Sequence, residues 1–104
     1  MTIKKFKNSI KIGDKLLITG YEDTRGDSPL QLIPTPAKMQ GWRTVTYSDT
    51  TGFYLNGTPE NGKRGCFCSW PKASELQIVD SSNFILSWIV DGKTIQRRHY
   101  QRTT

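Results

Sequence analysis

The side chains best suited to chemistry in this 104-residue chain are its single histidine, His99, and its two cysteines, Cys66 and Cys68. A nucleophilic pair would require one cysteine to meet His99 in the folded chain. Zinc needs four ligands, and these residues supply only three, at an unfamiliar spacing. His99 also stands among arginines, with no acidic residue close to it in the sequence. We therefore expect no enzyme activity, no metal site and no cofactor.

The two cysteines are separated by one residue. Side chains two positions apart on a strand point the same way, but a disulfide between them would be strained. A free cysteine in a strand commonly packs as a small hydrophobic residue. The pair predicts a protein with reduced thiols, which we expect in the cytoplasm.

Positive charge is concentrated at the two ends of the chain. Residues 1–16 carry five lysines against one aspartate, and residues 93–104 carry four cations and no acid, so each segment has a net charge of +4. The residues between them carry six cations and eight acids, and the whole chain has a net charge of +6. Either both ends meet one anionic partner, or each is a solvated terminus.

The first alternative predicts a nucleic-acid interface, in which cations neutralise phosphates and aromatic rings stack on bases. The candidate cations are Lys4, Lys5, Lys7, Lys11, Arg97, Arg98 and Arg102, and the candidate stacking residues are Tyr100 and Trp42. Trp88 is expected in the core, and Trp42 and Trp70 beside turn residues are expected to be partly exposed.

Short strands separated by glycine and proline dominate the pattern, and we expect no regular helix beyond one short turn. A long loop at residues 22–38 contains three prolines, with Leu30, Leu32 and Ile33 as a short edge strand. The dipeptide Asn56-Gly57 predicts a hairpin turn. The other strands are expected at residues 15–19, 41–48, 53–55, 65–70 and 77–79, with a loop at 58–65 and the helical turn at 74–76.

The last segment predicts a β-hairpin of residues 83–90 and 93–102 around a two-residue Asp91-Gly92 turn. Counting outward from that turn places Val90 opposite Lys93, Trp88 opposite Ile95 and Leu86 opposite Arg97. One face of the hairpin would then begin apolar and become cationic toward the C-terminus.

Residues 10–79 resemble the SH3-like small barrels, which include KOW-type modules and small phage proteins. The resemblance is carried by residues 12–18 (IGDKLLI), 41–45 (GWRTV) and 70–79 (WPKASELQIV). It implies an all-β barrel of about five strands with a long first loop and an added C-terminal hairpin at 83–102, within a single domain of residues 1–104.

The expected function is non-catalytic binding of DNA or RNA through the basic termini. The alternative is a small phage or mobile-element protein that binds and inhibits a host protein complex, for counter-defence or host takeover, in the host cytoplasm. In that case a partner groove would take up Leu30, Leu32, Ile33 and Pro34, and the basic ends would face an acidic host surface.

No apolar run approaches the roughly 18 residues of a membrane span. The basic start of the chain leads into no apolar stretch, so we also expect no secretory signal.

Overall fold

The computed structural model describes residues 3–24, 29–58, 63–71 and 75–103. Within these ranges the fold is all-β, with one short helix before the first strand. The elements are α1 (Ile3–Ser9), β1 (Lys15–Asp23), β2 (Gln31–Ile33), the 3-10 turn η1 (Ala37–Met39), β3 (Arg43–Ser48), β4 (Gly52–Thr58), β5 (Lys63–Ser69), β6 (Leu76–Ile78), β7 (Asn83–Val90) and β8 (Lys93–Arg102).

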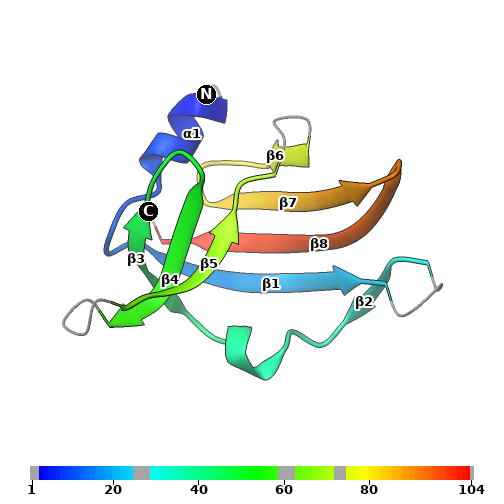
Figure 1. Ribbon diagram of the computed structural model, residues 1–104, viewed down its shortest axis with the longest axis horizontal. Helices are drawn as coiled ribbons and strands as arrows, with labels where there is room; N and C mark the ends of the chain where they lie inside the picture. The colour runs from blue at the N-terminus through cyan, green and yellow to red at the C-terminus, as the bar shows by residue number, and fades with distance from the viewer. Residues whose placement is uncertain (1–2, 25–28, 59–62, 72–74, 104) are drawn as a thin grey trace.

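The strands form one antiparallel sheet in the order β5-β4-β3-β1-β8-β7-β6, with β2 paired separately to β1. In Figure 1, β7, β8 and β1 run side by side, and β3, β4 and β5 cross them at an angle. The sheet is open, with β5 and β6 at its two ends. The predicted all-β class is confirmed, whereas a small barrel of about five strands is not.

The terminal hairpin lies inside this sheet. Strand β8 pairs with β1 from Leu16 opposite Arg102 to Asp23 opposite Gln96, and β7 pairs on its other side. The hairpin is therefore not an addition at the end of the fold, because it provides the strand that joins β1 to β7 and β6.

Around the hairpin turn the prediction holds only for the first pair. Asp91 and Gly92 have φ values of 51° and 77°, the left-handed conformation of a tight two-residue turn, and Val90 faces Lys93. A bulge between Trp88 and Ile89 then shifts the register by one residue, so the predicted partners of Trp88 and Leu86 are wrong. Trp88 faces Gln96, Leu86 faces Arg98 and Ser87 faces Arg97.

The core is built from the inward faces of the strands and from α1. Phe84 and Tyr100, which are register partners, stack with ring centroids 5.0 Å apart. Phe53 lies against Tyr100 from β4, with centroids 6.1 Å apart. Tyr100 is only 2% exposed, so the prediction that it stacks on a base is wrong. Its ring belongs to the core.

The helix α1 was not predicted, because seven residues are too few to show a helical repeat. Its apolar residue Phe6 and the following Ile10 are both buried. The Phe6 ring meets Phe84 and Trp70 edge-on, at centroid distances of 4.9 and 6.3 Å. Burial against the sheet therefore stabilises a helix that is too short to persist alone.

The predicted turn at Asn56-Gly57 is also wrong. Strand β4 continues through these residues to Thr58, and Asn56 pairs with Gly65 of β5. Asn56 adopts a φ of 54°, and its side-chain oxygen accepts a hydrogen bond from the Thr44 backbone N–H at 3.0 Å. Asparagine tolerates this conformation inside a strand as well as in a turn.

Trp42 is 48% exposed and Trp70 is partly exposed, as predicted. Trp88, which was expected in the core, is half-buried and packs against the core. No helix in the described ranges has the length and apolar character needed to cross a membrane.

Candidate functional site

The two basic ends of the chain meet at α1. Arg102 Nη1 donates a hydrogen bond to Ser9 Oγ at 2.7 Å, and the Arg102 guanidinium lies 5.5 Å from the Phe6 ring centroid. The Lys7 ammonium lies 5.7 Å from the Trp70 ring centroid. Lys4, Lys5 and Lys11, in and just after α1, are exposed. Of the predicted C-terminal cations, the structure brings Arg102 to the N-terminal group.

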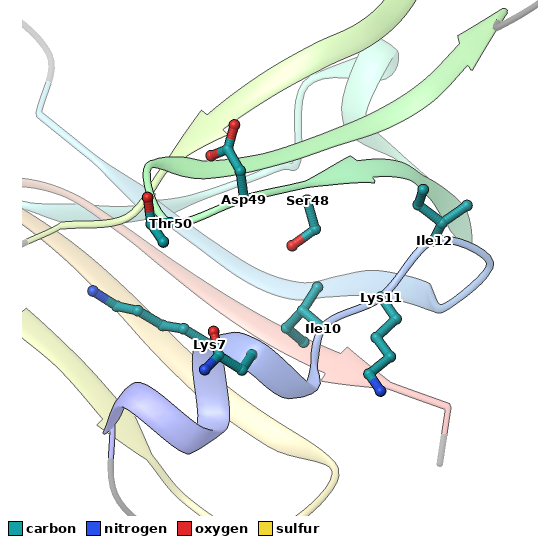
Figure 2. Close-up of a pocket in the computed structure, with 8 residues that line it drawn as sticks. Lys7, Ile10, Lys11, Ile12, Ser48, Asp49 and Thr50 are labelled. Carbon is teal, nitrogen blue, oxygen red and sulfur yellow. The ribbon is translucent and has the colours of Figure 1, made fainter.

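A cleft of about 480 Å³ lies between this basic end and the turn after β3 (Figure 2). Lys7 and Lys11 line it on one side, and Ser48, Asp49 and Thr50 line the other. The Asp49 carboxylate accepts hydrogen bonds from the backbone N–H groups of Thr51 and Gly52 and from the Thr51 hydroxyl. Its negative charge reduces the anion attraction of the two lysines.

Arg97 and Arg98 lie on opposite faces of β8. Arg98 stands on the core side, beside Leu86, while Arg97 is opposite Ser87 on the outer side. The guanidinium of Arg98 lies 4.8 Å from the Trp88 ring centroid and 5.6 Å from that of Tyr21. The two neighbouring cations therefore cannot act on one partner surface in the same way.

Within the described part of the chain, the hydrogen-bond partners of the Arg98 guanidinium are all neutral. Its Nε donates to Gln96 Oε1 at 2.9 Å, and its Nη1 donates to Tyr100 Oη at 3.4 Å and to Cys68 Sγ at 3.8 Å. Among the described residues, no carboxylate oxygen lies within 4.0 Å of it. A partly buried charge in this position gains most from an external anion.

The titratable neighbours of Arg98 do not neutralise it. Burial raises the pKa of the Cys68 thiol above its ordinary value, although the charges of Arg98 and Arg43 oppose that rise. Burial likewise raises the pKa of the Tyr100 phenol far above its ordinary value. Both groups are therefore protonated and uncharged at neutral pH.

Arg43 adds a second cation to the same region. It is only 5% exposed, and its buried Nε atom has no hydrogen-bond partner among the residues that the structure describes. Because its charge lowers the pKa of Cys68, its field reaches the Arg98 cluster. The two guanidinium groups give this part of the interior an excess of positive charge.

The Arg98 cluster opens into a groove of about 210 Å³ between β5 and the terminal hairpin. We call it the Arg98 groove. Phe67, Cys68 and Ser69 line it from β5, and Trp88, Ile95, Gln96 and Arg98 line it from the hairpin.

Aromatic rings continue from this groove across β5, β4 and β3. The Phe67 ring, 47% exposed, lies 4.7 Å from the Tyr54 ring, which lies 5.8 Å from the Tyr47 ring. Gly52 makes room for Phe67, since a Cβ there would stand 2.7 Å from its ring. We call Tyr47, Tyr54 and Phe67 the aromatic row.

On the outer face of β8, Arg97 and His99 share one carboxylate. Glu22 Oε2 lies 2.7 Å from His99 Nε2 and 3.8 Å from Arg97 Nη1. Arg97 Nε also donates to Ser87 Oγ at 3.2 Å. Arg97 and His99 line a separate groove of about 370 Å³, which we call the His99 groove.

The proline-flanked segment forms the predicted edge strand, β2, on the end of β1. Leu32 is 74% exposed and Pro34 is exposed, but Leu30 and Ile33 are half-buried, and Ile33 packs against the core. Of the four residues predicted to meet a protein partner, only Leu32 and Pro34 project into solvent.

Tyr54 and Phe67 of the aromatic row were not among the predicted site residues. Tyr54 lies between two core residues of β4, and Phe67 lies between the two cysteines of β5, so strand alternation places both rings outward. That signal was present in the sequence. The pairing of Glu22 with His99, 77 residues apart, had no local signal.

No protein-family model, curated protein or solved structure matches this chain. Among the described residues, no three histidine, cysteine or acidic side chains are grouped so that they could hold a metal ion.

Proposed function

We propose that this protein binds single-stranded nucleic acid, with a phosphate at Arg98 and bases along the aromatic row. The observation that carries the proposal is the Arg98 guanidinium, which is partly buried, held by neutral groups and open to a groove lined by Phe67 and Trp88. An anion that also bears flat rings complements both features. A nucleotide has this combination.

Single strands suit this surface better than duplexes. Aromatic stacking requires bases that are free of their duplex partners, and rings in succession on a sheet accept bases with little sequence preference. The lysines around α1 would attract the phosphate backbone at longer range, with an effect that salt screens.

We also propose that the fold is a variant of the SH3-like small barrels and that the protein acts in the cytoplasm. The strand order supports the first point, because the β3-β4-β5 meander lies on one edge of β1 and the last strand on the other. The second rests on the spacing of Cys66 and Cys68, at which a mutual disulfide would be strained.

The direct test compares Phe67→Ala with Leu32→Ala in binding to a fluorescent single-stranded oligonucleotide. Phe67 and Leu32 are both exposed apolar residues, so the pair controls for a general loss of apolar surface. Stacking is worth about 1–3 kcal/mol per base, so Phe67→Ala should weaken binding roughly 5- to 150-fold. Leu32→Ala should leave it unchanged. Equal affinities in the two variants would contradict the proposed site.

The alternative function is inhibition of a host protein complex through the proline-flanked segment. The observation that favours it is the exposure of Leu32 beside Pro34, at the end of the β1–β2 pair. Leu32→Asp tests it, because this side chain leaves the core untouched, whereas an aspartate at Ile33 would enter the core. Loss of a host complex from co-purification with Leu32→Asp, with nucleic-acid affinity unchanged, would support this second function.

A further inference from the structure

Three side chains at the His99 groove have chemistry that the binding function does not use. Arg97 and His99 line the groove, and Glu22 contacts both of them from β1. Strands β1 and β8 pair so that Glu22 faces Arg97 and Gly20 faces His99. The three side chains are all partly accessible, with exposed fractions of 21% for Glu22, 37% for Arg97 and 35% for His99. A carboxylate, a guanidinium and an imidazole thus meet on one open face of the sheet.

Neighbouring residues hold each of these groups in place. The His99 ring lies over Gly20, where a Cβ would come within 3.1 Å of ring carbon Cδ2. Glu22 holds the ring at Nε2, and Ser87 holds Arg97 at Nε. Among the described residues, no group is hydrogen-bonded to the other ring nitrogen, Nδ1.

An imidazole that is oriented by a carboxylate acts as a general base toward a hydroxyl group. A guanidinium beside it binds a phosphate and stabilises charge that develops on the phosphate oxygens. Together these groups fit a substrate that carries a hydroxyl next to a phosphodiester. RNA carries this arrangement in every nucleotide, and DNA lacks the hydroxyl.

We propose that the His99 groove cleaves single-stranded RNA by transesterification. The substrate class rests on the proposed function, and the activity goes beyond binding and departs from the sequence expectation of no enzyme activity. The groove, at about 370 Å³, is within the range of about 300–1,000 Å³ of small-ligand sites. Ile85 and Ile89 give it apolar surface, and its charged or titratable lining residues are Arg97, His99 and Glu75.

In this reaction His99 Nδ1 takes the proton of the ribose 2′-hydroxyl, and the 2′-oxygen forms a bond to phosphorus. The bond from phosphorus to the 5′-oxygen of the next nucleotide breaks, and that oxygen takes a proton from water. The resulting hydroxide and the protonated imidazole neutralise each other. The products are a 2′,3′-cyclic phosphate and a free 5′-hydroxyl, and Arg97 balances the charge on the phosphate in the transition state.

The test incubates the full chain with an end-labelled single-stranded RNA, and with the same strand carrying a 2′-deoxy sugar at the cleaved nucleotide. We expect fragments that end in a cyclic phosphate from the first strand and no cleavage at that position in the second. His99→Gln, purified in the same way, should lower the rate about 100-fold or more. A wild-type rate in His99→Gln, or cleavage of the deoxy position, would overturn the proposal.

Glu22 acts as a positioning residue, so its test needs a second readout. Because His99 is the chain's single histidine, its imidazole ¹⁵N signals are assigned without ambiguity. Glu22→Gln should change the balance of ring tautomers seen in those signals and slow cleavage, without unfolding the protein. An unchanged spectrum would contradict the assigned role.

Binding is measured separately on an all-deoxy strand, which cannot be cleaved by this route. Wild-type protein that binds this strand but leaves RNA intact would overturn the cleavage proposal and leave the binding function standing. Failure to bind the all-deoxy strand, with RNA cleavage present, would instead contradict the proposed binding at the Arg98 groove and leave the cleavage proposal standing.

Discussion

The two faces of strand β8 hold adjacent arginines in opposite electrostatic environments. Arg97 shares the Glu22 carboxylate with His99, so its charge is balanced within the fold. Arg98 lies among a thiol, a phenol, an amide and two aromatic rings, and none of these groups balances its charge. One residue of strand alternation therefore separates a cation that shares an internal carboxylate from a cation that is held by neutral groups.

This difference shows why a count of cations gives little information about an interface. The cationic end of the chain contributes Arg102 to the α1 contact, Arg97 to an ion pair and Arg98 to a groove. The partners of each side chain show how far its charge is already offset within the protein, and therefore how strongly it can attract a ligand.

The largest expected difference is in the reactivity of the two thiols, because Cys68 lines the Arg98 groove. Cys68 is buried and its thiol has a raised pKa, so little of it is the reactive thiolate at pH 8, whereas Cys66 is exposed. Iodoacetamide should modify Cys66 first and leave Cys68 unmodified in the native protein, as read by peptide mass spectrometry. Fast modification of both thiols would show that the groove floor is open.

A second effect follows from exchanging the charges on the two faces. Hydrogen bonds to charged groups are worth about 1.5–3 kcal/mol, so Arg98→Gln should weaken single-strand binding roughly 10- to 150-fold. Arg97→Gln should change it much less, because Glu22 already balances that charge. Calorimetric titration measures both affinities, and Arg98→Lys should recover part of the loss by restoring the charge. An equal loss of affinity in the two glutamine variants would contradict the different roles assigned to Arg97 and Arg98.

A smaller effect distinguishes the two glycines that make room for the rings. A Cβ at Gly52 would meet the Cys68 carbonyl oxygen at 2.3 Å, so the backbone must move, and Gly52→Ala should destabilise the fold by about 1–3 kcal/mol. At Gly20 the nearest atoms belong to the His99 ring, at 3.1 Å or more, and the side chain can shift. Gly20→Ala should therefore destabilise by less. Urea unfolding of both variants measures the two losses of stability. A larger loss for Gly20→Ala than for Gly52→Ala would contradict the prediction.

Local patterns in the sequence were enough to predict the class of the fold and part of its surface. Short segments bounded by turn residues predicted strands around Leu16, Val45 and Phe53, and the Asp91-Gly92 dipeptide predicted the final turn. The bulge between Trp88 and Ile89 shifts the β8 partner of Trp88, and of each β7 residue farther from the turn, by one position. No local signal in the sequence marks a bulge.

Longer-range features were not predictable in this way. α1 depends on burial of Phe6 against Phe84, and the partners of Arg98 come from four different strands. Glu22 and His99 are brought together by the pairing of β1 and β8, the first and last strands along the chain. These contacts follow from the topology, which a single sequence does not specify.

The central claim is that the Arg98 groove and the aromatic row bind single strands. Fluorescence anisotropy with matched single-stranded and duplex oligonucleotides, at a series of salt concentrations, tests it most directly. The account predicts tighter binding of the single strand, with part of the affinity retained at high salt because stacking does not depend on counterion release. Equal or tighter binding of the duplex, with all affinity lost as salt rises, would contradict it and would leave only the attraction of the basic ends.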